Sequence, residues 1–239
     1  MLEVDRIRVR YAGHAAPVLQ DFSLRVDAGE RVALIGPSGA GKTTLFRAIT
    51  GFVPLESGRI RVDGAEVDST DARSVREIRK RVATISQGHD LVDRLSVLQN
   101  VMAGALGRWS SLRALRFLFW PTGEEVGQAR AALQRVGIPE KLRARTADLS
   151  GGQHQRVAIA RALVHEPALL LADEPIASLD PALSDQILSL LCDLATESHV
   201  GLVCSLHQHQ FAASHFDRIV EIGGRQDSAR VASAEFSAP

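Results

Sequence analysis

The sequence contains little cysteine, no long apolar run and no excess charge of either sign. Its two cysteines, Cys192 and Cys204, match no metal-binding or redox spacing, which excludes a disulfide scaffold and favours a reducing compartment. No apolar run approaches the roughly 18 residues of a membrane span, and the first residues lack the apolar core of a secretory signal. Because 28 Lys and Arg residues balance 28 Asp and Glu residues, we expect no nucleic-acid partner.

The composition is that of a globular protein, and the apolar pattern predicts two kinds of strand. The hydrophobic fraction of 45% and the charged fraction of 23% are close to globular averages. Alternating apolar and polar residues at 6–10 and 22–26 predict an antiparallel layer with one solvated face. Runs that are apolar on both faces, at 31–35, 168–172 and 201–205, predict buried parallel strands. The expected fold class is therefore α/β.

The middle of the chain differs in amino-acid composition from both ends. Ala, Leu, Arg, Gln and Glu dominate there and β-rich runs disappear, so we interpret residues 88–165 as an inserted helical subdomain. Residues 1–87 and 166–223 are expected to form the α/β core with its β layer. Residues 224–239, rich in Ser, Ala and charge, are expected to be a frayed tail. The whole chain is then a single domain with an insertion.

A glycine-rich loop follows the first predicted parallel strand. Residues 36–43 read GPSGAGKT and match G-x-x-x-x-G-K-[ST] between a strand and a helix. Such a loop lets backbone N–H groups converge on a phosphate at a helix N-terminus. A glycine-rich turn with a solvated lysine is the alternative, and the flanking strand and helix argue against it. The residues predicted to bind the phosphate are Gly36, Pro37, Ser38, Gly39, Ala40, Gly41, Lys42, Thr43 and Thr44.

Two adjacent acids end another predicted parallel strand, at Asp173 and Glu174. Ligands of open α/β sheets bind at the carboxyl ends of the strands. We expect Asp173 to hold Mg²⁺ together with the Thr43 hydroxyl, and Glu174 to accept a proton from the attacking water. Capping of the next helix, or plain solvation, is the ordinary alternative for such a pair, and the nearby phosphate loop makes it the weaker one.

The segment 149–153, LSGGQ, has the pattern of a helix start. Ser150 can cap the helix, with Gln153 at the reciprocal position of a capping box. Gly151 and Gly152, just inside that start, cost about 1 kcal/mol each relative to alanine, which indicates that the backbone must closely approach a ligand. An anion is the ligand that a bare helix N-terminus attracts.

Together these motifs resemble the nucleotide-binding subunit of an ATP-binding cassette (ABC) transporter. Gln87, Asp180 and His207 occur in the family's order, and the match extends over residues 2–222. The LSGGQ segment is the discriminating part, because many phosphate-loop enzymes share the other motifs. The resemblance implies a P-loop NTPase (RecA-like) core with an N-terminal antiparallel β layer and an inserted helical subdomain. It also implies ATP and Mg²⁺ as cofactors and hydrolysis of ATP to ADP and phosphate.

The same resemblance implies a head-to-tail homodimer. Ser150, Gly151 and Gly152 of one copy are then expected to contact the γ-phosphate held by Lys42 of the other. Residues 178–180 resemble the loop that communicates across the dimer. Tyr11 resembles the aromatic residue that stacks on adenine. The other implied nucleotide-contacting residues outside the phosphate loop are Ser150, Gly151, Gly152, Gln153 and Asp180. The implied catalytic residues are Lys42, Gln87, Glu174 and His207, and the implied magnesium ligands are Thr43, Gln87 and Asp173.

Each implied role has a more ordinary alternative. Tyr11 is the only tyrosine, and a lone aromatic at a strand end usually packs against its neighbours. Gln87 would ordinarily be a solvated loop residue, and His207, after an apolar strand, a core histidine. The motif order favours the functional roles. Zinc binding by His207, His209 and His215 is not expected, because their spacing fits no zinc motif.

Residues 109–120 contain both tryptophans, together with phenylalanines and interleaved arginines. Such a basic amphipathic stretch could lie on a membrane surface, pack within the helical subdomain or contact a permease. We favour the last two, because one short aromatic segment offers little area for anchoring in lipid.

Within the family the chain is most similar to the ATPases of phosphonate importers. The supporting segments are 94–101, 103–107, 173–181 and 205–208. Two features depart from the usual pattern: Ser-Gln-Gly-His at 86–89, near the expected permease contact, and a histidine at position 154 where glutamine is common.

The expected function is therefore to power uptake of phosphonate or a related phosphorus oxyanion through a separate permease, with indirect dependence on a substrate-binding protein. The expected location is peripheral, on the cytoplasmic face of the cell membrane. A non-transport ABC ATPase, regulating a membrane complex or associated with ribosomes or DNA, is the alternative.

Overall fold

The computed structural model describes residues 1–177 and 179–223. Its N-terminal part forms an antiparallel sheet in the strand order β2-β1-β4-β5. The strands are β1 (Leu2–Val9), β2 (Leu19–Val26), β4 (Ser57–Val62) and β5 (Ala65–Glu66). Alternate residues of β1 and β2 are buried, so one face packs on the core and the other meets solvent. The predicted antiparallel layer is confirmed.

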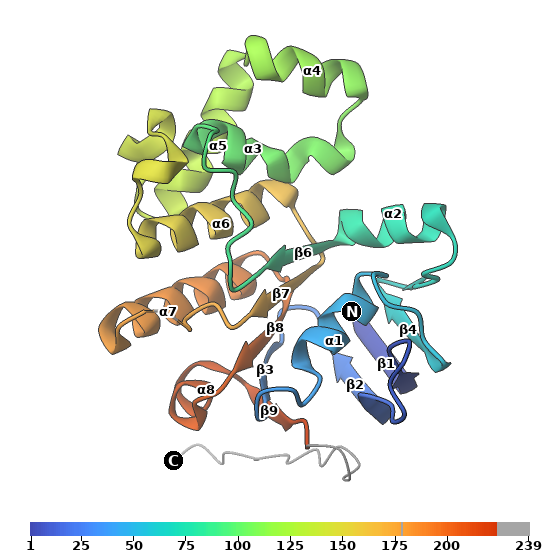
Figure 1. Ribbon diagram of the computed structural model, residues 1–239. Helices are drawn as coiled ribbons and strands as arrows, with labels where there is room; N and C mark the ends of the chain where they lie inside the picture. The colour runs from blue at the N-terminus through green and yellow to red at the C-terminus, as the bar shows by residue number, and fades with distance from the viewer. Residues whose placement is uncertain (178, 224–239) are drawn as a thin grey trace.

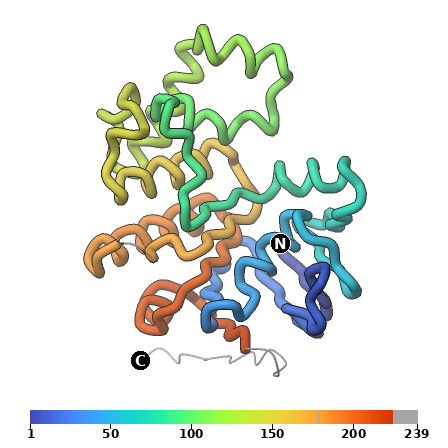
Figure 2. The backbone as a smooth tube through the Cα atoms, in the orientation of Figure 1, coloured from blue at the N-terminus to red at the C-terminus, as the bar shows by residue number. Residues whose placement is uncertain are grey.

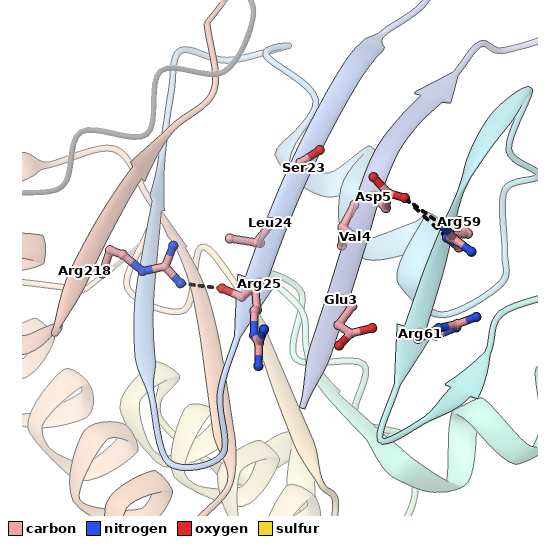
Figure 3. A pocket seen from close by; sticks show the side chains of 9 residues that line it. All are labelled: Glu3, Val4, Asp5, Ser23, Leu24, Arg25, Arg59, Arg61 and Arg218. Atoms are coloured by element: carbon pink, nitrogen blue, oxygen red, sulfur yellow. Dashed lines mark hydrogen bonds and ion pairs between the residues drawn. The ribbon is translucent and has the colours of Figure 1, made fainter.

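The solvent face of this sheet carries rows of opposite charge. Glu3 on β1 lies opposite both Arg25 on β2 and Arg61 on β4. Asp5 lies opposite Arg59 and accepts a hydrogen bond from its Nε at 3.3 Å. Figure 3 shows these side chains around an open pocket on the sheet's outer face. Facing pairs of opposite charge stabilise a solvated sheet face without requiring a ligand.

The second sheet is parallel, in the order β6-β7-β8-β3-β9. Its strands are β3 (Arg31–Ile35), β6 (Val82–Ile85), β7 (Leu169–Asp173), β8 (Gly201–Leu206) and β9 (Arg218–Glu221). The three predicted parallel strands lie side by side at its centre, because β8 pairs with both β7 and β3. All carboxyl ends therefore meet at one edge.

Two apolar cores lie on opposite faces of the parallel sheet, which explains why its strands are apolar throughout. Val32 and Leu34 of β3 belong to the core shared with α1 (Lys42–Ile49) and the antiparallel sheet. Ala33 and Ile35, on the other face, belong to the core shared with α7 (Pro181–Glu197). Figure 1 shows α7 on one side of the parallel strands and α1 with the antiparallel strands on the other. Successive residues of each central strand thus serve different cores.

The chain between β6 and β7 forms a group of helices, here called the helical lobe, above the sheet edge in Figure 1. Its α-helices are α3 (Val97–Met102), α4 (Ser111–Phe119), α5 (Gly123–Arg135) and α6 (Gly151–His165). Its 3₁₀ helices are η1 (Ala103–Arg108), η2 (Pro139–Arg143) and η3 (Thr146–Asp148). The predicted inserted helices are thus present. The subdomain boundaries at residues 88 and 165 stay an interpretation, and the predicted tail at 224–239 lies outside the described residues.

The remaining helices flank the two sheets. Helix α2 (Ala72–Arg81) precedes β6, and Asp71 caps it by accepting a hydrogen bond from the Arg73 N–H. Helix α8 (His209–His215) connects β8 with β9. Within the part of the chain that the structure describes, no helix is both long enough and apolar enough to cross a membrane.

Candidate active site

The phosphate loop connects β3 with the N-terminus of α1, as its sequence predicts. Gly41, the residue before the helix, has a left-handed backbone with a φ of 106°, and a Cβ there would lie 2.7 Å from Leu19 Cδ2. A Cβ on Gly36 would lie 2.6 Å from the carbonyl oxygen of Ile222. Both positions therefore require glycine. The first turn of α1 contains no acidic residue, so the positive end of its dipole faces the loop uncompensated.

Lys42 lies inside this loop, and its side chain is only 5% exposed. Its Nζ donates hydrogen bonds to the carbonyl oxygens of Gly36 at 2.6 Å and Pro37 at 3.3 Å. The Oε1 of Glu174 is 4.0 Å away. Burial lowers the pKa of the Lys42 ammonium, while the carboxylates of Glu174 and Asp173 oppose that shift. A cation is thus held at the centre of a ring of backbone groups, where phosphate oxygens can replace the carbonyl acceptors.

The Thr43 hydroxyl and Asp173 face each other. Thr43 Oγ1 donates a hydrogen bond to Asp173 Oδ2 at 2.8 Å, and Ser205 Oγ donates to Asp173 Oδ1 at 2.7 Å. Ser205 Oγ also accepts from the backbone N–H of Glu174 at 2.9 Å. Ser205 is fully buried on β8, directly opposite Asp173 in the register. It orients both acids, and our sequence analysis missed it. The available signal was a hydroxyl in the otherwise apolar run 201–206.

Glu174 and His207 form the closest contact of two titratable side chains at this sheet edge. His207 Nε2 lies 2.6 Å from Glu174 Oε1. Glu174 has a left-handed backbone, with a φ of 50°, which is unusual outside glycine. Gln87, Glu174 and His207 all line one cavity of about 350 Å³. The structure therefore brings together three of the residues with expected catalytic roles, in a space that can admit a reacting group.

The LSGGQ segment forms the predicted capping box. Ser150 Oγ accepts from the Gln153 N–H at 3.4 Å, and Gln153 Oε1 accepts from the Ser150 N–H at 3.1 Å. A Cβ on Gly152 would lie 2.8 Å from Leu183 Cδ2, whereas one on Gly151 would meet nothing within 4 Å. These residues bond within their own helix and not with the phosphate loop of the same chain. The helix tip is therefore available to another molecule.

Tyr11 and Asp180 occupy different surroundings. The Tyr11 hydroxyl lies 3.2 Å from Thr44 Oγ1, which places the aromatic ring beside the phosphate-loop helix. The Asp180 carboxylate accepts a hydrogen bond from the Leu183 N–H at 3.0 Å and caps α7. The structure thus shows Asp180 as a helix cap, while the adenine role of Tyr11 and the dimer-loop role of Asp180 stay predictions. Position 178 lies outside the described residues.

The segment after Gln87 is held by an arginine that the sequence analysis missed. His89 and Asp90 both have left-handed backbones, with φ values of 60° and 47°. Arg161, on α6, donates hydrogen bonds to the carbonyl oxygens of His89 at 2.8 Å and Asp90 at 2.6 Å. The helix that begins at Ser150 therefore also fixes the Gln87 segment.

The two departures from the family pattern meet in space. The rings of His89, in the segment after Gln87, and His154, on the first turns of α6, have centroids 6.0 Å apart. Burial, followed by the neighbouring His154, lowers the pKa of His89. The two substituted positions therefore form one contact between this segment and α6, which neither departure indicates by itself.

These features define the class of the protein. A glycine cradle at a helix N-terminus, a buried lysine inside it and a threonine facing an aspartate across parallel strand ends are the site of a P-loop nucleoside triphosphatase. The chain belongs to the ABC transporter family, whose sequence model matches residues 19–177. It is accordingly an ATP-binding and ATP-hydrolysing protein, and the predicted family and fold are confirmed.

Relatives with curated names extend over most of the chain. The Phosphonates import ATP-binding protein PhnC 1 of Ruegeria sp. (strain TM1040) is 41% identical over 92% of this chain and 84% of its own length. The Phosphite import ATP-binding protein PxtA of Stutzerimonas stutzeri is 42% identical, covering 95% of this chain and 80% of its own length.

Solved structures show the same architecture. The dimeric structure of MJ0796, a bacterial ABC transporter cassette, matches with a TM-score of 0.80 and 26% identity, covering 93% of this chain and 94% of that chain. The structure of cbiO1 from Clostridium perfringens, part of an ABC transporter complex, matches with a TM-score of 0.79 and 29% identity, covering 92% of this chain and 84% of its own.

Proposed function

We propose that the chain powers the uptake of phosphonate or a related phosphorus oxyanion through a separate permease. The observation that carries this proposal is the 41–42% identity, over more than nine-tenths of the chain, to proteins named for phosphonate and phosphite import. Both names describe small phosphorus oxyanions. The solute itself does not enter the ATP site. The proposed substrate class therefore rests on the similarity to these relatives, and the proposed use of ATP rests on the geometry of the site.

In the proposed reaction the chain's own side chains position ATP and accept one proton from the attacking water. Lys42 and the loop N–H groups bind the phosphates, and Gln87 and His207 orient the attacking water and the γ-phosphate. Glu174 accepts the proton of that water, for which its oxygen beside His207 is suitably placed. The contact between His207 Nε2 and Glu174 Oε1 then stabilises the Glu174 carboxyl group after it has taken up the proton. Catalysis is therefore mainly positioning and charge neutralisation.

The site also fits a magnesium ion. Mg²⁺ prefers hydroxyl, carbonyl and carboxylate oxygens, and Thr43 Oγ1 and Asp173 Oδ2 lie 2.8 Å apart at the edge of the phosphate loop. We propose that these two residues hold the ion, with Gln87 as a third ligand. When bound, the ion neutralises charge on the β and γ phosphates.

Two copies are proposed to form the working unit. Among the residues that the structure describes, none lies within 4 Å of a Cβ built on Gly151, and Ser150 bonds only within its own helix, so this tip can accept a phosphate presented by a second copy. The dimeric bacterial cassette with the same fold supports this arrangement. A substrate-binding protein and a location on the cytoplasmic face of the cell membrane complete the proposed assembly.

The permease is proposed to dock in the groove between the helical lobe and the sheet. This groove, of about 320 Å³, is lined from both sides, by Phe52 and Arg79 on one and by Gly104 and Arg161 on the other. The Phe52 side chain is 65% exposed and stacks under the Arg79 guanidinium at 3.8 Å. Arg161 also holds the Gln87 segment, so a permease bound here would contact the residue that positions this part of the ATP site.

Deletion of the gene tests the substrate class. Cells lacking the chain should fail to take up methylphosphonate or phosphite while inorganic phosphate uptake continues, and the wild-type gene should restore uptake. A Lys42→Ala gene is the matched control and should not restore it. Normal uptake of both oxyanions in the deletion strain would contradict the proposal. Copurification of the chain with ribosomes or DNA instead of membranes would favour a non-transport ATPase.

A further inference from the structure

Asp173 and Glu174 are adjacent in the chain, yet both carboxylates face the phosphate loop. Asp173 Oδ2 accepts a hydrogen bond from Thr43 Oγ1 at 2.8 Å. Glu174 Oε1 lies 4.0 Å from Lys42 Nζ. Successive side chains of a regular β-strand point to opposite faces of the sheet. Two consecutive acids on one extended strand could not both reach the loop, so the chain must turn between them.

The backbone of Glu174 makes this turn. Strand β7 ends at Asp173, and Glu174 follows it with a φ of 50°, in the left-handed region. That region is unfavourable for a residue with a side chain, and such a conformation persists only where the surrounding structure fixes it. Here the Glu174 N–H donates a hydrogen bond to Ser205 Oγ at 2.9 Å. The direction of the Glu174 side chain thus depends on a hydroxyl 31 residues further along the chain.

Both hydrogen bonds of the Ser205 hydroxyl go to these two acids. Besides accepting from Glu174, the hydroxyl donates its only hydrogen to Asp173 Oδ1 at 2.7 Å. Ser205 is fully buried, and the other residues of β8 are glycine or apolar. A buried hydroxyl is unfavourable unless it is hydrogen-bonded, and its partners here belong to the ATP site. Figures 1 and 2 show β7 and β8 side by side in the parallel sheet, which lets one side chain reach both acids.

His207, two positions after Ser205, contacts the same glutamate at its other end. Its Nε2 lies 2.6 Å from Glu174 Oε1, whereas Ser205 binds the Glu174 backbone. The end of β8 therefore fixes Glu174 at the main chain and at the carboxylate. The histidine contact alone leaves the backbone of Glu174 free to return to the extended conformation, so the two contacts have different effects.

We infer that Ser205 is a positioning residue for ATP hydrolysis, which sets the placement of Asp173 relative to Glu174. The bond that it donates leaves the other Asp173 oxygen directed at Thr43, where the magnesium ion is proposed to bind. The bond that it accepts keeps Glu174 in the left-handed turn. The inference rests on the proposed roles of the two acids and is independent of the transported solute. Loss of this hydroxyl should therefore affect metal affinity and turnover together.

Ser205→Ala tests this role by removing both bonds. We expect kcat for ATP to fall about 10–100-fold, and the Mg²⁺ concentration for half-maximal rate to rise by a similar factor. ATP affinity measured by calorimetry in EDTA should stay at the wild-type value, because Lys42 and its loop are unchanged. Binding of Mn²⁺ in the presence of AMP-PNP, followed by electron paramagnetic resonance, should weaken in parallel without any turnover. Ser205→Thr keeps the hydroxyl and should recover most of both losses.

Cys204→Ala is the matched control, because Cys204 is the neighbouring buried residue of β8 and packs in the core on the other face of the sheet. It should lower the melting temperature and leave kcat and the metal dependence unchanged. Thermal unfolding shows which variants are folded, and Ser205→Cys, with its weaker donor, replaces the alanine variant if that one is not.

Two results would overturn the inference. The first is metal binding and kcat in Ser205→Ala equal to those of Cys204→Ala, and the second is a folded Ser205→Thr without recovery. Either result, together with the expected losses in Asp173→Asn and Glu174→Gln, would count against the role of Ser205 alone. Wild-type metal dependence and turnover in those two variants would instead show that the proposed roles of the acids are wrong.

Discussion

Thr43 donates a hydrogen bond to Asp173 across 2.8 Å, although 130 residues separate them in the chain. The contact exists because β3 and β7 are parallel and flank β8, so that the loops after both strands leave the same edge of the sheet. Ser205, at the end of β8, bonds to Asp173 from the middle of this group. The proposed metal ligands are thus brought together by strand order.

Asp173→Asn should lower magnesium-dependent ATP hydrolysis by about 10²-fold, because an amide keeps the size of the side chain but removes the charge that attracts the ion. The measurement is the hydrolysis rate against Mg²⁺ concentration. Asp193→Asn, on the exposed side of α7, is the control and should behave as wild type. An unchanged magnesium dependence in Asp173→Asn would remove this residue from the proposed site.

Glu174→Gln should retain ATP binding and lose about 10²–10³-fold in turnover, since the amide cannot accept a proton from water. ATP-bound copies should then accumulate as a closed dimer, detectable by size-exclusion chromatography with light scattering. Hydrolysis at the wild-type rate would show that another group is the base. A strictly monomeric ATP-bound variant, even at high concentration with the permease present, would contradict the shared site.

Lys42→Ala should weaken ATP binding by about 10–100-fold, because the loop loses the one cation that it holds among its backbone groups. Titration calorimetry with ATP gives the affinity directly. Lys141→Ala, a partly exposed lysine on η2 in the helical lobe, is the control. Equal ATP affinity in Lys42→Ala and the control would mean that the loop does not bind phosphate as proposed.

The helical lobe should lose stability in acid through Glu125. Burial raises the pKa of this carboxyl, but hydrogen bonds from Arg116, the Thr122 N–H and Arg113 outweigh burial and hold the pKa below its usual value of 4.5. The stabilisation is therefore complete at pH values above this usual, unfolded pKa and is lost as the pH falls through the lower folded pKa. Tryptophan emission should report the change, because Trp109 packs on Phe117 of α4.

Glu125→Gln should remove this acid dependence and cost about 1–3 kcal/mol of stability at neutral pH, because Arg113 and Arg116 lose their shared partner. Parallel denaturant titrations of the variant and the wild type at pH 7 and at pH 3.5 check both statements. The same loss of stability in acid for both proteins would show that other carboxyls control the lobe.

Arg161→Ala should lower kcat for ATP about tenfold and leave KM nearly unchanged, because Arg161 holds the carbonyl groups that follow Gln87 and does not line the phosphate loop. Arg161→Lys should recover part of the rate, since a single ammonium can still donate to these carbonyls without the planar fork. Steady-state kinetics and thermal unfolding should be measured on both. Parallel losses of kcat and of melting temperature, without recovery by lysine, would indicate a purely structural role.

Features that depend on neighbouring residues were predicted well. The phosphate loop and the capping box at Ser150 each involve residues a few positions apart, whose hydrogen bonds are local. Residues 109–120 illustrate the limit of such reasoning. Their apolar and basic side chains show that the segment is amphipathic, but not that two of its arginines pair with Glu125, because Glu125 belongs to the following helix.

The sequence by itself determined the kind of chemistry, which is the binding of a phosphate and a cation. The glycine loop with its lysine and the two adjacent acids each consist of a few consecutive residues, so they can be recognised without the fold. It also determined which strands are buried, because a strand that is apolar on both faces is stable only where both faces are covered by other elements. Only the tertiary structure decided which distant groups cooperate: Ser205 with Asp173, Arg161 with the segment after Gln87, and Glu125 with α4. Such contacts depend on strand order and helix packing, which bring together side chains that no local spacing relates.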